Sequence, residues 1–384
     1  MPNLRVPIGI LISSDGPYSA VARSMLCGAL QAIDEINASG ASVAFEPVVG
    51  NPAGQLSRYV ALGEEMLAAG IKHVVGCYTS SSRKEIIPLF EKADALLWYP
   101  SHYEGFESSP NVVYTGPVAN QHLLPLVDYL THRVGKTAVC VGSNYIWAWE
   151  NNRVLREAMG AGGGAVLAER YFPLGSTDFG QVIEAILEAA PAFVFNTLIG
   201  ISSYHFLRDF RAACEARGID QPMMIPVASC TLSEPELQAI GPEAMDGHIT
   251  SSVYFASIDT IENAHFTASY QARNPDGPAV SADAEASYIA VHLLGLAIAE
   301  AGTVQIDAVK RAVARQVIRA PQGEVRVDAD TMHAALTPRI GRSRRDGQFE
   351  ILMQAPAPVA ADPYLIRTAS RLGSVVRPNL RVAS

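Results

Sequence analysis

The sequence predicts an α/β fold: two doubly wound parallel-sheet lobes joined by a hinge of several crossovers. Three observations carry this prediction. Strand-like and helix-like segments alternate over most of the 384 residues, as in chains built from βαβ units. At least eight strand candidates are present, which suits two sheets better than one. No Pro/Gly/Ser-rich linker divides the chain, so we expect short crossovers rather than two independent domains.

The predicted strands are short apolar runs, which are typical of parallel strands buried on both faces. They cover residues 6–11, 43–48, 73–77, 95–99, 112–114, 137–141, 193–196 and 224–227. Helical spacing predicts helices over 20–37, 56–69 and 81–93. Gly40 and Gly70 follow two of these helices as stop signals, and Ser82 and Glu85 have the spacing of a capping box.

The lobes are predicted to alternate along the chain. Residues 1–117 and 257–335 form lobe I, and residues 118–256 and 336–384 form lobe II, with the ligand cleft between them. Gly116-Pro117 and Ser257-Ile258-Asp259 are the predicted crossing points.

Composition argues against nucleic-acid binding. The chain is 49% hydrophobic and 17% charged, with a formal net charge of −9, whereas phosphate binding needs clustered Lys and Arg. The densest basic spot is Arg339, Arg342, Arg344 and Arg345, which we interpret as a solvated turn between strands.

No motif predicts catalysis. The sequence lacks a Gly-x-Gly-x-x-Gly after the first strand, a Walker-type Lys, an HExxH and a GxSxG elbow. The five cysteines have no CxxC spacing, and no metal or cofactor is predicted. Cys230 follows a strand with Glu234 and Glu236 nearby, but no Lys lies close in sequence to activate a thiol. We therefore expect a packed thiol, no catalytic residue and no enzyme.

Location is predicted from two features. The N-terminal stretch has no long apolar run followed by a small-residue cleavage site. No run approaches the roughly 18 apolar residues of a membrane span. These features favour a cytoplasmic protein without membrane contact, and a periplasmic protein is the alternative if a signal peptide precedes this sequence.

Hydroxyls and aromatic rings gather where the predicted strands end. In parallel α/β sheets, ligands bind outside the carboxyl ends of the strands. These ends are Ser13-Ser14, Tyr78-Thr79-Ser80-Ser81, Tyr99-Pro100-Ser101-His102-Tyr103, Ser143-Asn144-Tyr145-Ile146-Trp147, Asn196-Thr197 and Ser229-Cys230-Thr231. Almost no charged side chain joins them, so the cleft suits a small neutral ligand with one polar and one apolar end.

Two alternatives stay open at this point. Ser80 precedes a helix, whose free N–H groups would favour a carboxylate or carbonyl oxygen, but Ser81 or Ser82 could simply cap that helix. Tyr99 and Trp147 could wall a ligand or pack in the core with a hydrogen-bonded edge.

Several blocks resemble a known family. The helix at residues 28–37, Gly-Ala-x-x-Ala-Ile-x-Glu-Ile-Asn, is similar to type I periplasmic binding proteins. A longer block is similar to their short-chain amide and urea branch. It contains Val75-Gly76-Cys77-Tyr78-Thr79-Ser80, Leu97-Trp98-Tyr99-Pro100, Tyr103-Glu104-Gly105-Phe106-Glu107 and Asn120-Gln121, with further matches at 254–260, 320–323 and 339–341.

That branch contains the cytoplasmic amide sensor of amidase operons and the periplasmic urea receptor of an ABC transporter. The tail Asp362-Pro363-Tyr364-Leu365 is similar to the sensor's. The resemblance implies a ligand-operated negative regulator of amide catabolism that holds an RNA-binding antiterminator protein inactive, with a homo-oligomer possible. The alternative it implies is a substrate-binding receptor of an ABC transporter for urea, short-chain amides or branched-chain amino acids.

The resemblance also implies a ligand pocket. It falls on Tyr78, Ser80, Tyr99, Ser101, Tyr145 and Thr197. Ser80 would bind the amide carbonyl, Ser101 or Thr197 would accept from the amide NH2, and rings would enclose the alkyl end. Trp147 and His102 depart from the family pattern, and we predict that they make this protein's ligand differ from its relatives' ligands.

Overall fold

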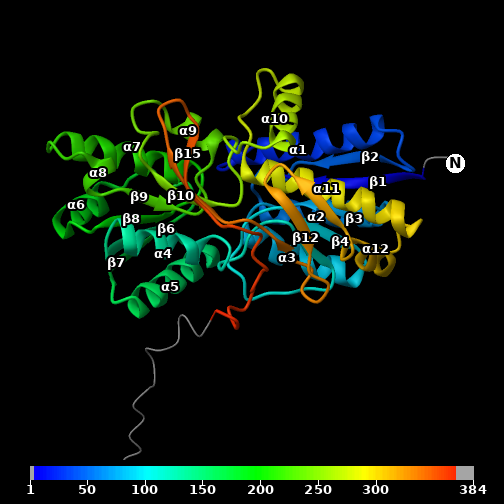
Figure 1. Ribbon diagram of the computed structural model, residues 1–384, viewed down its shortest axis with the longest axis horizontal. Coiled ribbons are helices and arrows are strands. Elements are labelled where there is room, and N and C mark those ends of the chain that lie inside the picture. The colour runs from blue at the N-terminus through cyan, green and yellow to red at the C-terminus, as the bar shows by residue number, and fades with distance from the viewer. Residues whose placement is uncertain (1–3, 369–384) are drawn as a thin grey trace, which may run out of the picture.

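The computed structural model describes residues 4–368 of the chain. Residues 1–3 and 369–384, which include the start of the N-terminal stretch and the end of predicted lobe II, lie outside the described part. Two lobes stand side by side, each an α/β layer structure (Figure 1). The two-sheet α/β prediction is confirmed.

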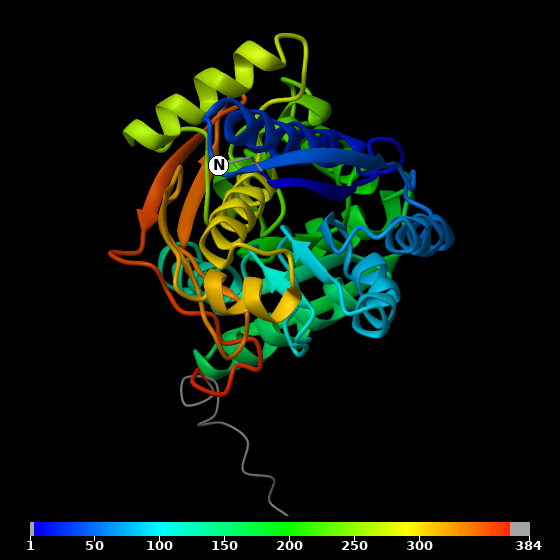
Figure 2. The same cartoon turned by 90° about the vertical axis from the view of Figure 1, so that its right-hand side faces the viewer.

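Lobe I contains a five-stranded parallel sheet in the order β2-β1-β3-β4-β5. Its strands are β1 (Leu4–Leu11), β2 (Val43–Gly50), β3 (His73–Gly76), β4 (Leu96–Tyr99) and β5 (Val112–Tyr114). Its helices are α1 (Ser19–Ala38), α2 (Leu56–Ala68), α3 (Ser80–Lys92), α10 (Ile261–Arg273), α11 (Ala282–Ala301) and α12 (Ile306–Val313). Figure 2 views the molecule onto this lobe.

Side-chain alternation along β4 explains the layers of lobe I. Leu96 and Trp98 pack in the cluster that contains the apolar sides of α1 and α11. Leu97 and Tyr99 pack in the cluster under α2 and α3. Because successive strand residues point to opposite faces, the continuous apolar run buries both faces at once.

Lobe II contains a seven-stranded sheet in the order β15-β14-β10-β9-β8-β6-β7. Its strands are β6 (Thr137–Ser143), β7 (Ala165–Phe172), β8 (Phe193–Thr197), β9 (Val227–Ser229), β10 (Ile249–Ser252), β14 (Arg339–Ser343) and β15 (Phe349–Gln354). Its helices are α4 (Leu123–Arg133), α5 (Ile146–Ala161), α6 (Gly180–Ala189), α7 (Ile201–Glu215), α8 (Gln221–Met224) and α9 (Glu234–Ile240). The strands β14 and β15 run antiparallel at one edge.

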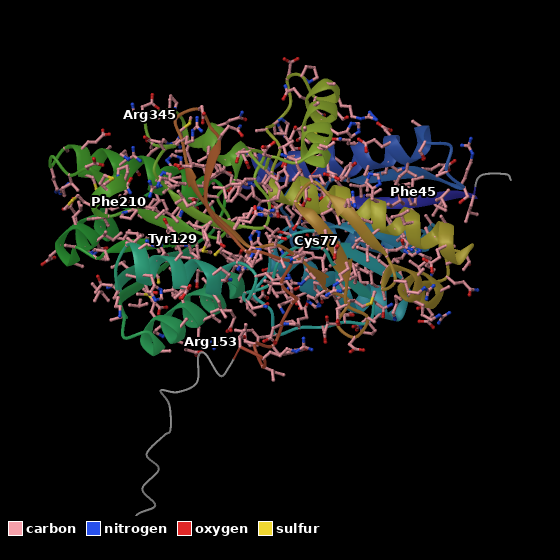
Figure 3. The ribbon with its side chains drawn as sticks, in the orientation of Figure 1. Phe45, Cys77, Tyr129, Arg153, Phe210 and Arg345 are labelled. Atoms are coloured by element: carbon pink, nitrogen blue, oxygen red, sulfur yellow. The ribbon has the colours of Figure 1, made fainter. Side chains whose placement is uncertain are left out.

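Large aromatic residues are buried in both lobes. Phe45 on β2 and Phe210 on α7 are both buried, and Figure 3 labels them toward opposite ends of the molecule.

The chain passes between the lobes at three places. They are residues 115–122 between β5 and α4, residues 253–260 between β10 and α10, and residues 336–338 before β14. A small sheet of β11 (Val317–Ala320), β12 (Gly323–Val327) and β13 (Ala334–Ala335) lies beside the third passage. The predicted crossing points at 116–117 and 257–259 fall within the first two passages.

Arg339 corrects one prediction. It is buried and donates to the backbone carbonyls of Val253, Thr337 and Gln322, so it ties hinge segments together. Burial lowers the pKa of its guanidinium to about 10. The other three arginines of that basic spot, in or just after β14, are exposed as predicted.

Two local predictions were wrong. The predicted strand at 224–227 begins only at Val227, because Asp220 caps the short helix α8 and Pro222 fits its first turn. The α3 helix is capped by Thr79, whose side chain accepts from the Ser82 N–H at 3.2 Å, and not through the Ser82–Glu85 pair.

Among residues 4–368, one helix is long and apolar enough by composition to cross a membrane. It is α11, and 72% of the relevant stretch is buried inside the fold. The sequence analysis predicted no such run.

Candidate functional site

A cavity lies between the lobes and against the hinge. It is lined by Pro100, His102, Pro117, Cys230, Thr231, Leu232, Ser233, Glu234, Ser251, Ser252, Val253, Tyr254, Phe255, Ala282, Asp283 and Ala286. About 20 Å³ of it is accessible to the centre of a water molecule, which is room for one or two waters. The lobes are therefore in a closed arrangement around a narrow space.

Asp283 places a carboxylate on the lobe I side of this cavity. It stands in the first turn of α11, whose cap Ser281 accepts from the Ala284 N–H. Its Oδ1 accepts from Ser101 Oγ at 2.8 Å and lies 3.7 Å from His102 Nδ1. A carboxylate is favoured at a helix N-terminus by the free N–H groups there.

Two more carboxyl groups come from lobe II, in the first turn of α9. Glu236 completes a capping box with Ser233, and Glu234 Oε1 accepts from the Ala256 N–H at 2.8 Å. Burial raises the pKa of Glu234 to about 7. Burial, with Asp283 adding to it, raises the pKa of Glu236 to about 8. At neutral pH the Glu236 carboxyl is therefore mostly protonated and can donate as well as accept.

The acidic residues at the cavity correct the prediction that almost no charged side chain lines the cleft. The prediction failed because it considered strand ends alone. Asp283 and Glu234 lie in helix first turns that the tertiary fold brings to the same cavity. No Lys or Arg is among the lining residues, so the site is rich in acceptors and lacks a fixed cation.

Rings from both lobes meet beside the cavity. The Tyr78 ring lies 5.1 Å from Tyr18 and 5.9 Å from His102, and the Trp147 ring lies 5.2 Å from His102. Tyr145 stacks on Trp147 at 6.3 Å. We call Tyr78, His102, His122, Tyr145 and Trp147 the cleft cluster. Burial raises the pKa of Tyr78, and Glu236 and Asp283 add to this, so that hydroxyl stays protonated.

Ser80 belongs to a different group. Its hydroxyl donates to Glu104 Oε2 at 2.5 Å, and Arg83 Nη2 lies 3.2 Å from Glu104 Oε1. Arg83 also pairs with Glu107 at 2.8 Å. We call Arg83, Glu104, Glu107, Tyr99, Tyr103, Tyr114 and His333 the Arg83 cluster. The Ser80 hydroxyl thus already has a hydrogen-bond partner within lobe I. The sequence analysis expected this hydroxyl to bind the ligand instead.

Tyr99 and Thr197 lie inside the lobes. The Tyr99 hydroxyl donates to the Tyr78 carbonyl at 2.8 Å, and the Arg83 guanidinium carbon lies over the Tyr99 ring, 4.7 Å from its centroid. Thr197 points into lobe II and lies 3.3 Å from Asn152 Oδ1. Neither residue lines the cavity, because strand alternation turns each side chain toward a helix layer. Of the eight predicted residues, only His102 lines it, while Ser101 reaches it through Asp283.

Sequence reasoning missed Asp283, Glu234, Glu236, Ser233 and His122. A signal was available for three of them. Ser233-x-x-Glu236 is a capping-box spacing, and Ser281 before Asp283 is a helix-start pattern. Helix starts face the carboxyl ends of parallel strands in α/β lobes, so both patterns could have been placed at the cleft.

A backbone contact closes the cleft on the side of the β1–α1 loop. The Ile201 N–H donates to the Pro17 carbonyl at 3.0 Å, which joins the first turn of α7 in lobe II to lobe I. Gly200 has φ 56°, and a β-carbon there would overlap the Pro17 carbonyl oxygen. Glycine at position 200 therefore permits this approach of the lobes.

Cys230 lines the cavity as a buried thiol. Burial alone raises its pKa, and no neighbouring cation opposes that rise. Without a positive field or base the thiolate does not form. Among the described residues, no cluster of His, Cys, Asp and Glu could hold a metal ion.

Comparison with known proteins decides the family. A model of the periplasmic binding protein domain matches residues 6–370. The chain belongs to the periplasmic binding protein family. Its fold is that of the type I members of this family.

Solved structures of this fold superpose over nearly the whole chain. An ABC transporter solute-binding protein from R. palustris, in complex with 4-hydroxybenzoate, has a TM-score of 0.84 and 19% identity over 95% of this chain and 100% of that one. A solute-binding protein from Rhodopseudomonas palustris HaA2, in complex with p-hydroxybenzoic acid, has a TM-score of 0.85 and 21% identity over the same shares.

A branched-chain amino acid substrate-binding protein from Streptococcus pneumoniae, in complex with isoleucine, has a TM-score of 0.79 and 18% identity, covering 92% of this chain and 99% of that one. At these identities the likeness establishes the fold alone.

One curated relative matches only locally. A limonene hydroxylase from Geobacillus stearothermophilus is 24% identical over 129 residues, which is 34% of this chain and 24% of that protein. The chain thus spans about a quarter of that relative's length, and no activity transfers from it.

The comparisons favour the alternative of the sequence analysis over its main prediction. Neighbours are solute receptors of ABC transporters for benzoates and amino acids. The amide-sensing regulator, its antiterminator partner and the cytoplasmic location find no support among them.

Proposed function

We propose that this protein is the solute-binding receptor of an ABC transporter and works outside the cytoplasm. Its proposed solute is small, uncharged and rich in N–H groups, namely urea or a short-chain amide. The observation that carries the proposal is the meeting of Asp283 and Glu234, from different lobes, in one interlobe cavity without a Lys or Arg in its lining.

Charge supports this ligand class over its rivals. A benzoate would bring a carboxylate to a cavity that already holds the carboxyl groups of Asp283 and Glu234, and no Lys or Arg in its lining would offset the desolvation of that carboxylate. An amide NH2 group donates two hydrogen bonds, which a carboxylate accepts well. The resemblance of residues 75–121 to the amide and urea branch supports the same class.

Binding is expected to work through hinge closure. Acceptors from α11 and α9 belong to different lobes, so a ligand gains both sets only when the lobes are together. The ligand shifts the open–closed balance by that difference in affinity. The permease would then recognise the closed form.

A thermal-shift and calorimetry panel tests the proposal. Urea, acetamide and propionamide should raise the melting temperature, whereas 4-hydroxybenzoate and isoleucine should not. Asp283→Asn should weaken amide binding by about 1.5–3 kcal/mol, which is the range for a hydrogen bond to a charged group. Tight binding of benzoate or isoleucine with no response to any amide or urea would overturn the proposal.

A second experiment separates receptor from regulator. The purified protein, loaded with its solute, should stimulate the ATPase of its reconstituted transporter. Stable ligand-dependent capture of an RNA-binding antiterminator, with no stimulation of the transporter, would restore the regulator.

A further inference from the structure

Two side chains of the cleft cluster are buried with ring nitrogens that have no partner. The exposed fraction of His122 is 0% and that of Trp147 is 1%. Among the described residues, His122 Nδ1 and Nε2 and Trp147 Nε1 make no hydrogen bond. A buried polar group without a partner costs free energy, so native proteins rarely keep one without a reason.

Both side chains flank the same cavity residue. The His122 ring lies 6.2 Å from the His102 ring, and the Trp147 ring lies 5.2 Å from it. The three come from different segments: the loop after β4, the first hinge passage and the first turn of α5. Other unpartnered buried atoms occur in the described chain, but among the described ring pairs only these two residues border a ring that lines the interlobe cavity.

We propose that Trp147 and His122 bind the carbonyl oxygen of the ligand through their ring N–H groups. The inference rests on the proposed function and deepens it. The carboxyl groups of Asp283 and Glu234, which line the cavity, would accept the amide N–H groups, and the ring N–H groups would donate to the oxygen at the other end. The site would then bind both the N–H groups and the carbonyl oxygen of a planar amide or urea. An amine or a carboxylate would supply only one of these two kinds of group.

The charge of this pair supports a neutral oxygen as its target. Burial, with His102 adding to it, lowers the pKa of His122 to about 3, so the ring is uncharged at neutral pH. The indole N–H is uncharged as well. Two neutral donors can bind a carbonyl oxygen, whereas a buried carboxylate would need a positive charge that the described residues lining the cavity do not supply.

The test removes the ring N–H of each residue by substitution to Phe, which keeps an aromatic ring at the position. Trp147→Phe removes the indole N–H, and His122→Phe removes both ring nitrogens. The control is Trp149→Phe on the same helix, because Trp149 is 45% exposed and its Nε1 already donates to Asn144 Oδ1 at 3.2 Å. Calorimetry measures propionamide and its thioamide, which is also neutral and has a weakly accepting sulfur in place of the carbonyl oxygen, and thermal unfolding is measured without ligand.

We expect Trp147→Phe and His122→Phe each to lower propionamide affinity at least fivefold, while Trp149→Phe leaves it unchanged. Wild type should prefer propionamide to the thioamide, and both cleft variants should lose most of that preference. The unliganded melting temperature should not fall in Trp147→Phe, because the substitution removes an unsatisfied buried group.

Wild-type affinity for propionamide in Trp147→Phe would overturn the inference and leave the proposed function standing. Failure of the wild type to bind urea, acetamide and propionamide would instead remove the proposed function, and the inference with it. If His122→Phe does not fold, Trp147→Phe decides the matter alone.

Discussion

The Arg83 cluster and the cleft cluster both contain Tyr and His rings, yet they differ in how the polar atoms of their side chains are paired. In the Arg83 cluster, Tyr103 donates to the Glu107 carbonyl and Tyr114 donates to the Glu107 carboxylate, at 3.1 and 3.0 Å. His333 stacks on Tyr114 with ring centroids 4.1 Å apart. Within the described part of the chain, none of these seven residues has an unpartnered buried side-chain atom.

The cleft cluster leaves the ring nitrogens of His122 and Trp147 without partners at the boundary between the described lobes. Tyr and His rings alone therefore do not distinguish the two clusters. The pairing of their polar atoms does, and it is consistent with a core in one case and with the proposed binding site in the other, because a core gains stability by satisfying its polar groups and a binding site keeps some for its ligand. Three predictions test that contrast, in order of decreasing effect.

Arg83→Ala should have the largest effect. The Arg83 side chain is fully buried between Glu104 and Glu107, so its loss leaves two carboxylates without their buried cation. We expect a loss of about 3–5 kcal/mol in the free energy of unfolding, measured by denaturant titration.

Arg5→Ala is the control, since the Arg5–Glu46 pair is exposed at both ends and such pairs contribute at most about 1 kcal/mol. Equal losses in the two variants would mean that the Arg83 cluster is not a tightly satisfied core.

Gly200→Ala should act on closure instead of stability. Its β-carbon would overlap the Pro17 carbonyl oxygen of the other lobe, so the closed form is penalised. We expect ligand affinity to fall about tenfold, or roughly 1.4 kcal/mol, with a larger radius of gyration for the liganded protein in solution scattering.

Gly218→Ala provides a matched control. Gly218 also has a left-handed φ, of 69°, but nothing lies within 4 Å of the place that a β-carbon would take there. The Gly218→Ala variant should have similar backbone strain but unchanged ligand affinity. An equal loss of affinity in both variants would argue against closure through the Pro17–Ile201 contact.

Tyr99→Phe should give the smallest effect. It removes one hydrogen bond to the Tyr78 carbonyl, which costs about 1 kcal/mol of stability. Ligand affinity should stay within about twofold of wild type by calorimetry. A much larger drop in affinity would place Tyr99 in the binding site after all, as the family resemblance implied.

Much of the fold followed from local pattern. The apolar runs at β1, β3 and β4 and the helical spacing of α1 and α2 gave elements whose bounds agree with the structure to within two residues. Neighbouring residues set these features, because strand burial and helix periodicity depend on short spacings. The antiparallel strands β14 and β15, of which β15 forms the edge of the sheet, escaped prediction because antiparallel strands carry weaker continuous apolar signals.

For the candidate site, less could be predicted from the sequence than for the fold. By itself the sequence determined the α/β class, the two lobes and the rings and hydroxyls at strand ends. Only the tertiary structure decided which of them face the cleft. It turned Tyr99 and Thr197 into the lobes, paired Ser80 with Glu104, and brought Asp283 and Glu236 together from separate helices, α11 and α9. The physical reason is that direction and hydrogen-bond pairing are settled between elements distant in sequence, which no local pattern encodes.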